Sequence, residues 1–282
     1  MDELTTGFYQ YWGKTAEDGS YHLLPYHCLD VAAVGKHWWE QKPSLRKQFS
    51  RQLNLSEDTA LAWIMFFLAM HDFGKFDIRF QAKSFRVCSQ LYPHKIPEQP
   101  KSNYFHGPKG FMWLVQELNA YLEQQNLRPK QKRPYHQWMQ QVAGHHGQIP
   151  AEAAPSPPLF VAPEILEFDA KARIEWINEL KDVFLAPQQI ELSDIPANVP
   201  NLLSGFCSVC DWIGSNRDYF KFHPKDLEPR DLNDYFIGRA KDAAEAVEKL
   251  GVISRPLTIG GMASLFPERK PRGLQTLIED LP

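Results

Sequence analysis

Apolar residues recur along most of the chain at spacings of three and four, which is the pattern of amphipathic helices. One such segment opens at Ser56, a favoured N-cap residue, carries two acidic residues in its first turn and stops at Gly74. Strand-like alternation bounded by hairpin signals is nearly absent, and no internal repeat is found. Helices are therefore predicted over the segments 25–41, 56–74, 105–126, 135–147, 169–184, 198–215 and 234–251.

The connections between these segments are rich in proline, notably over residues 92–100, 148–164 and 186–200. Proline cannot continue a helix, because it lacks the amide donor and its ring clashes with the preceding turn. None of these connections has the length or monotony of a flexible interdomain linker. We therefore predict a single all-α domain over residues 1–282, a helical bundle with long proline-rich loops, in which residues 252–282 form a less regular C-terminal extension.

Composition narrows the class of protein. The chain is 43% hydrophobic and 23% charged with a net charge of −3, so nucleic acid would need a local basic path and not a basic surface overall. Four cysteines are too few for a disulfide scaffold. The longest apolar run, residues 60–70, is too short to span a bilayer, and the N-terminus lacks the features of a secretion signal. We expect a cytoplasmic protein with no membrane partner.

Histidine and aspartate interrupt several of the apolar helical segments. Residues 71–75 read HDFGK directly after the longest apolar run, and burying such charges is costly unless they are paired or bound to a metal. The GHHG stretch at 144–147 places adjacent histidines between glycines, where the backbone is free to turn. A metal centre accounts for all of these positions with one cause, and the candidate ligands are His27, His71, Asp72, His106, His145, His146 and Asp211.

The type of metal follows from the ligands. Imidazole and carboxylate together suit manganese, iron, nickel, cobalt or zinc, whereas magnesium is expected to prefer a site made of oxygen ligands. Seven candidates exceed the needs of one ion but suit two divalent ions that share Asp72. Two ions about 3.5–4 Å apart can clamp a phosphodiester for in-line attack. The residues therefore favour a two-metal hydrolase.

A series of segments occurs in a characteristic order over nearly the whole chain: YWGK, HLLPYHCLDVAAV, FFLAMHDFGKFDIRFQ, FHG, GHHG, LLSGFCSVCDWIGS and LQTLIEDLP. With them the chain resembles the HD phosphohydrolase superfamily. More narrowly, it is similar to the HD nuclease domain of the CRISPR-associated helicase-nuclease of type I systems, in its I-E form. The resemblance implies an HD-domain helical bundle.

The resemblance also implies roles for individual residues. Asp72 and Lys75 match catalytic positions, and Lys75 would contact the scissile phosphate or a metal-bound water. One metal would be held by His27, His71, Asp72 and Asp211. A second metal would be held by His106, His145 and His146, with Asp72 as the bridge.

By the same resemblance, the expected activity is metal-dependent cleavage of single-stranded DNA, both nicking and degradation, during CRISPR interference. The expected partners are single-stranded DNA, a superfamily 2 helicase domain or subunit, and the Cascade surveillance complex with its crRNA. The sequence contains no G-x-x-x-x-G-K-[ST] loop, so we expect no ATP site in this chain. The C-terminal extension would then lead toward a helicase that is absent from this chain.

A path for DNA is suggested by the basic residues after the HD doublet. If residues 75–86 are helical, Lys75, Arg79, Lys83 and Arg86 line one face that leads away from the metals. Phe76 and Phe80 either offer stacking surfaces for bases or belong to the core, and the core is the more common role.

Two other functions remain open. An HD phosphohydrolase acting on mononucleotides or cyclic nucleotides would use the same ligands, and a metal-binding docking adaptor would use them without catalysis. The CSVC stretch at 207–210 is expected to be a pair of buried small residues, since no second cysteine pair accompanies it. Surface or capping positions are expected for the remaining histidines, His22, His37, His94, His136 and His223.

Overall fold

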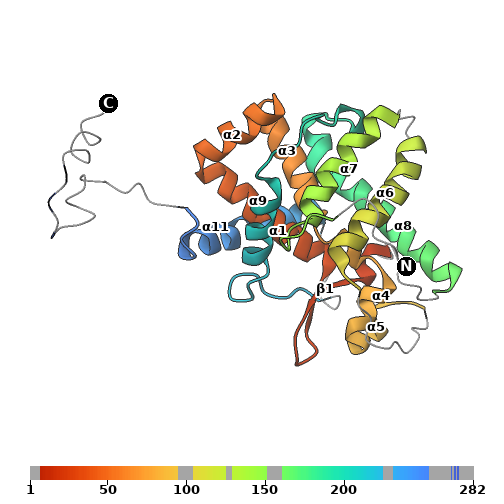
Figure 1. Cartoon of the computed structure of the whole chain (residues 1–282). Helices are drawn as coiled ribbons and strands as arrows, with labels where there is room; N and C mark the ends of the chain where they lie inside the picture. The colour runs from red at the N-terminus through yellow and green to blue at the C-terminus, as the bar shows by residue number, and fades with distance from the viewer. Residues whose placement is uncertain are drawn as a thin grey trace.

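The computed structural model describes residues 7–94, 104–124, 129–150, 161–224 and 231–253, together with residues 268, 270 and 272. Helices make up nearly all the regular structure of these residues, which confirms the all-α prediction (Figure 1). The α-helices are α1 (Leu24–Gln41), α2 (Pro43–Leu53), α3 (Glu57–Leu68), α4 (Ile78–Gln81), α5 (Phe85–Leu91), α6 (His106–Gln124), α7 (Pro129–Ala143), α8 (Pro163–Leu180), α9 (Leu203–Gly214), α10 (Leu232–Gly238) and α11 (Ala240–Lys249).

Short turns of helix connect these elements. They are the 3₁₀ turns η1 (Gly7–Gln10), η2 (Phe73–Lys75), η3 (Ala82–Ser84), η5 (Ala186–Gln188) and η6 (Leu192–Asp194), and the π-helical turn η4 (Lys181–Leu185). Of the proline-rich connections, residues 186–200 are described and contain η5 and η6. Most of the other two connections and of the predicted C-terminal extension, 252–282, lies outside the described residues.

A β-hairpin near the N-terminus was not predicted from the sequence. Strands β1 (Trp12–Thr15) and β2 (Tyr21–Leu23) pair antiparallel, with Lys14 opposite His22. Gly19 turns the chain between them with a φ of +85°, a conformation that favours glycine. The hairpin projects from one edge of the bundle (Figure 1). Its first strand contacts the interior, since the Gly13 carbonyl accepts from Lys75 and the Lys14 ammonium lies 3.5 Å from Asp211.

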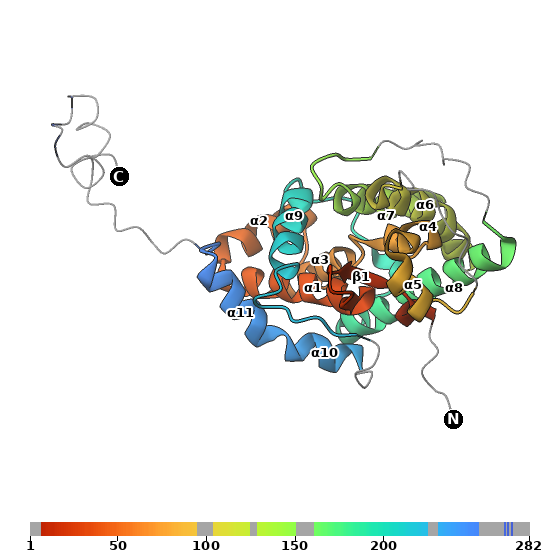
Figure 2. The same cartoon turned by 90° about the horizontal axis from the view of Figure 1, so that it is seen from below.

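Helix α1 forms the centre of the bundle. It packs against α3, α9, α10 and α11, and α9 and α11 lie on one side of it while α6 and α7 lie on the other (Figures 1 and 2). Helix α9 approaches α1 closely at Gly214, where an added Cβ would lie 3.0 Å from the Cα of Val31. Because Asp211 and His27 each lie about one helical turn from this contact, the close approach brings them together.

Helix α3 begins as predicted but ends earlier. The Ser56 hydroxyl accepts a hydrogen bond from the amide of Thr59 at 3.2 Å, so it caps the helix. The α-helix stops at Leu68, not at Gly74, and the chain continues in tighter turns with bonds such as that from the His71 amide to the Leu68 carbonyl. The HD doublet therefore lies in the turns that follow α3 and not on the helix itself.

The continuous helix proposed for residues 75–86 is wrong. The segment divides into η2, α4, η3 and α5, because Asp77 adopts an extended conformation with a φ of −152° and caps α4 by accepting from the Arg79 amide. The basic residues of this segment therefore do not share one helix face. No single described helix is both long and apolar enough to cross a membrane; one pair, Pro43–Leu53 with Glu57–Lys75, meets that test only jointly and is bent by 89°.

Candidate metal centre

The fold brings all seven candidate ligands to one place. Each comes from the end of a helix or from the adjoining turn, except Asp211, which lies within α9. They fall into two groups whose donor atoms lie within 4.8 Å of one another inside each group. The first group is His27, His71, Asp72 and Asp211, and the second is His106, His145 and His146.

The first group is buried. The Nε2 atom of His27 lies 3.1 Å from Oδ2 of Asp72 and 3.4 Å from Oδ1 of Asp211. The Nε2 atom of His71 lies at similar distances, 3.3 Å and 3.5 Å, from the same two oxygens. Two imidazole nitrogens and two carboxylate oxygens thus converge on one point.

The second group lies on the other side of Asp72 and opens toward solvent at His146. The Nε2 atom of His106 lies 3.1 Å from Oδ1 of Asp72, and that of His145 lies 3.7 Å from the same oxygen. The Nε2 atoms of His146 and His106 are 2.9 Å apart. Asp72 therefore presents Oδ2 to the first group and Oδ1 to the second, which is the arrangement that a bridging carboxylate needs.

Helix ends orient two of the imidazoles in the same way. His71 follows the last residue of α3 by three positions, and its Nδ1 donates to the Leu68 carbonyl at 2.9 Å. His145 repeats this after α7, where its Nδ1 donates to the Val142 carbonyl at 2.7 Å. Because the carbonyl holds a proton on Nδ1, each ring turns its Nε2 toward the centre, where it can coordinate a cation when that nitrogen carries no proton.

The donor atoms fit a metal. Among the described residues, the Nε2 atoms of His27, His71 and His145 are buried without a hydrogen-bond partner. Buried polar atoms are rarely left in this state, because each costs free energy comparable to a lost hydrogen bond. Orphaned atoms that all point to one centre are explained if they coordinate cations.

The electrostatics of the centre keep it ready for cations. Burial lowers the pKa of His27 to about 4 and that of His145 to about 3, so both imidazoles are neutral. Burial opposes a charge on His71, but the Asp72 and Asp211 carboxylates together outweigh it and raise the pKa of His71 to about 9. Burial likewise opposes a charge on Asp72, yet Lys75 and His71 hold its pKa well below the usual range.

Two lysines reach the first group. Lys75 is buried, its Nζ lies 2.6 Å from Oδ2 of Asp72, and it donates to the Gly13 carbonyl at 2.9 Å. Lys14, in β1, places its Nζ 3.5 Å from Oδ1 of Asp211 and is partly exposed. The sequence analysis included Lys14 in the YWGK segment but assigned it no role, because the hairpin that carries it inward was not predicted.

The residues proposed to bind DNA are separated by the fold. Arg79 is 5% exposed and pairs with Asp77 at 2.5 Å between Nη2 and Oδ2, so the expectation that it lies on an open basic face is wrong. Lys83 and Arg86 are exposed, and their role stays a prediction. Phe76 and Phe80 belong to the core, which was the more common of the two roles considered from the sequence, and they offer no stacking surface for bases.

Two histidines expected at the surface are buried. His22 is 2% exposed, and its Nε2 lies 2.8 Å from Oδ2 of Asp30. His223 is 8% exposed, and its amide donates to Nδ1 of His22. Nothing in their immediate sequence indicated burial, since the contact joins residues about 200 positions apart. The prediction for the cysteines is confirmed, because Cys207 and Cys210 are both buried and free.

Comparisons with known proteins converge on one family. The family model described as "Cas3, HD domain" matches residues 12–220. The CRISPR-associated endonuclease/helicase Cas3 of Escherichia coli (strain K12) is 35% identical over 295 residues, which is 96% of this chain and 33% of that protein. The chain thus spans about a third of the length of this relative.

Solved structures share the fold. T. fusca Cas3 aligns with a TM-score of 0.67 and 22% identity, covering 97% of this chain and 30% of that chain. The Thermus thermophilus cas3 HD domain in the presence of Ni²⁺ aligns with a TM-score of 0.57 and 21% identity, covering 87% of this chain and 90% of that one. A CRISPR RNA-guided surveillance complex, pre-nicking, aligns with a TM-score of 0.60 and 19% identity, covering 96% and 30%.

Proposed function

This chain belongs to the Cas3 HD-domain family, and from that premise we propose that it is a metal-dependent nuclease that cleaves single-stranded DNA in CRISPR interference. The observation that carries the proposal is the position of Asp72, whose two carboxylate oxygens face two separate groups of imidazoles. A single-metal site would use only one of these groups as ligands and would not account for the other.

The residues of the chain have distinct parts in this reaction. One cation would be held by the first group and a second by the other, with Asp72 common to both. When bound, two divalent ions supply the Lewis acidity that neutralises a phosphodiester and activates water for in-line attack. Lys75 holds the Asp72 carboxylate in place, and the partly exposed ammonium of Lys14 beside Asp211 favours the approach of an anionic substrate.

The ligands favour manganese, iron, nickel or cobalt over magnesium, since five of the seven are imidazoles, two of the four in the first group and all three in the second. The Ni²⁺ in the description of the Thermus thermophilus structure supports this choice.

We extend the proposal to the partners. The E. coli relative is named an endonuclease/helicase, and one similar structure is a surveillance complex before nicking. We infer that a superfamily 2 helicase, as a domain or a subunit, feeds one strand to this chain in the cytoplasm at a site opened by Cascade and its crRNA. The sequence contains no phosphate-binding loop for ATP, so strand separation is assigned to that partner.

A second function competes with the first. A cavity of about 480 Å³ beside His106 and His146 has the size of a small-ligand site, which favours a phosphohydrolase acting on mononucleotides or cyclic nucleotides. The third alternative, a docking adaptor, gains no support, because a vestigial centre would not need its complete set of ligands.

Incubating the purified chain and Mn²⁺ with circular single-stranded DNA, closed circular duplex and nucleoside triphosphates separates these functions. We expect the single-stranded circle to be cut, the duplex to stay intact without a helicase, and the nucleotides to be poor substrates. The Asp72→Ala variant should be inactive, whereas Asp58→Ala, at the exposed opposite end of α3, should match the parent chain. Cleavage by Asp72→Ala at saturating Mn²⁺ would rule the proposal out.

A further inference from the structure

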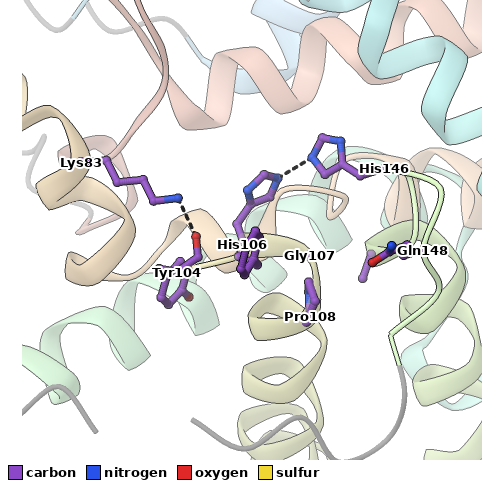
Figure 3. Close-up of a pocket in the computed structure, with 9 residues that line it drawn as sticks. Lys83, Tyr104, His106, Gly107, Pro108, His146 and Gln148 are labelled. Carbon is purple, nitrogen blue, oxygen red and sulfur yellow. Dashed lines mark hydrogen bonds between the residues drawn. The ribbon is translucent and has the colours of Figure 1, made fainter. Parts of the chain in front are cut away.

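The cavity beside the second group of histidines is shared with the metal centre. His106 and His146 form part of its wall, Lys83 lies at one side and Gln148 at the other (Figure 3). The same two histidines belong to the second metal group. Whatever occupies the cavity is therefore in contact with the residues that would hold a cation.

Phe105 supplies an exposed aromatic ring to this cavity. It is 70% exposed, whereas Phe76 and Phe80, the rings proposed from the sequence, are buried. The backbone around Phe105 is held in place, because the adjacent Tyr104 is buried and its hydroxyl donates to the Gly74 carbonyl at 2.8 Å. A large apolar ring held at the mouth of a cavity beside a metal site offers a stacking surface at little entropic cost.

Lys83 supplies a positive charge to the same cavity. Its Nζ donates to the Tyr104 carbonyl at 2.5 Å, which places the ammonium at one side of the cavity whose wall also includes Phe105 (Figure 3). The residue is exposed, and the bond to Tyr104 uses only one of the three N–H donors of the ammonium, so donors remain for an anion. An aromatic face and an ammonium beside a metal site match the base and the phosphate of one nucleotide.

We propose that this cavity binds the nucleotide next to the scissile phosphate of a single strand, with its base stacked on Phe105 and its phosphate beside Lys83. This inference rests on the proposed nuclease function and names the part of the strand that the centre recognises. Base stacking on an aromatic ring is tolerant of sequence, so the subsite selects unpaired bases and not a particular base. In duplex DNA the base is already stacked and paired, and the subsite would stay empty.

The test compares the binding of two fluorescent oligonucleotides of equal length, oligo(dT) and a chain of tetrahydrofuran abasic sites, by anisotropy in EDTA so that no strand is cut. For oligo(dT) we expect Phe105→Ala to raise the Kd about 5- to 150-fold, the range for one base stacked on an aromatic ring. For the abasic strand it should leave the Kd unchanged. Phe105→Trp should retain the preference for bases.

Two further variants sharpen the comparison. Lys83→Met should weaken both oligonucleotides alike and reduce the salt dependence of binding by about 0.7 of a unit, as for one lost phosphate contact on a single strand. Phe85→Ala removes an aromatic ring that is 49% exposed but does not line the cavity, and it should behave like the parent chain.

Equal binding of oligo(dT) by the parent chain and Phe105→Ala would overturn the proposal. Competition with thymidine monophosphate tests whether the cavity prefers a strand or a free nucleotide. If thymidine monophosphate displaces oligo(dT) at an equal concentration, the proposal is also overturned and the cavity is a site for a free nucleotide. The proposed function is tested apart from the subsite. If the parent chain binds bases through Phe105 but never cuts DNA with Mn²⁺, the nuclease assignment fails, and only the binding of an unpaired base by Phe105 stands.

Discussion

The carboxylate of Asp72 has an unusual density of nitrogen atoms around it. Its two oxygens lie within 3.7 Å of nitrogens from Lys75, His27, His106, His71 and His145. Without a cation, the charge of this buried carboxylate is balanced by the Lys75 ammonium at 2.6 Å and by a protonated His71. A bound cation would balance this charge instead, so Lys75 should contribute most to the stability of the fold when metal is absent.

Replacing Lys75 by methionine tests this exchange of roles. Removing one partner of a buried ion pair costs about 3–5 kcal/mol, so the free energy of unfolding in EDTA should fall by that order. With Mn²⁺ bound, the loss should be much smaller, because the cation then balances Asp72. Denaturant unfolding with and without Mn²⁺ measures both values.

A matched control is Lys36→Met, which breaks an exposed pair with Glu40 and should change stability little under either condition. If Lys75→Met is destabilised equally with and without Mn²⁺, Lys75 does not balance the charge of Asp72 in place of a cation.

At the scale of elements, the turn η2 and the start of α6 hold the two metal groups together. Gly74 packs against the α6 backbone so closely that an added Cβ would lie 2.0 Å from the His106 carbonyl oxygen and 2.6 Å from the Gly110 amide nitrogen. Neither contact atom can move without moving the helix. Since α6 carries His106, the absence of a side chain at residue 74 sets the distance from His106 to Asp72.

We therefore predict that Gly74→Ala displaces α6 and weakens the second metal site. The variant should lose at least about 2 kcal/mol of stability, as overpacked sites do, and its bound Mn²⁺ should fall toward one ion per chain. Elemental analysis after gel filtration gives the metal content.

Gly205 in α9 is the control for this change, because nothing lies within 4 Å of an added Cβ there. Gly205→Ala should stabilise the protein by about 0.5–1 kcal/mol and leave the metal content unchanged. Full occupancy of both sites in Gly74→Ala would show that the position of α6 is not set by this contact.

The elements also show how far sequence reasoning reaches. Helices were predictable because their apolar periodicity is local, as in α3 with its Ser56 cap. The hairpin was not, since its strands span only 12–15 and 21–23 and show little alternation. The predicted basic helix face over residues 75–86 was wrong, because Asp77 breaks the helix and pairs with Arg79 in the interior, a contact that periodicity does not reveal.

The site was predictable in composition but not in geometry. The seven histidines and aspartates stood out because polar residues interrupt apolar helices, and the structure brings all seven together. Lys14 and Phe105 were missed, although each lies in a segment that the sequence analysis quoted. Their positions depend on the hairpin and on the start of α6, which tertiary packing determines.

At the scale of the whole molecule, the centre is built by segments from residue 13 to residue 211, and a second polar network ties the C-terminal helices to α1. The Asp30 carboxylate in α1 accepts from Tyr235 at 3.0 Å and from Nε of Arg239 at 2.9 Å, and it pairs with His22 on its other oxygen. Helices α10 and α11 are thereby fixed against the helix that carries His27. Metal binding at the centre should accordingly be coupled to global unfolding.

This coupling predicts a metal-dependent melting temperature. At Mn²⁺ concentrations 100-fold above its Kd, one site adds about 2.7 kcal/mol, and a chain of this size gains about 2–4 °C per kcal/mol. The Tm should rise by roughly 5 °C or more with Mn²⁺ and return to its starting value with EDTA. The Asp72→Ala variant should show little rise, and a full rise in that variant would place the stabilising ion elsewhere.

The central claim is that Asp72 joins two cation sites, and anomalous diffraction from crystals grown with Mn²⁺ tests it most directly. The account predicts two anomalous peaks per chain, one among His27, His71, Asp72 and Asp211 and one among His106, His145 and His146, with Asp72 in contact with both. A single peak at saturating Mn²⁺, or two peaks of which one does not contact Asp72, would contradict it.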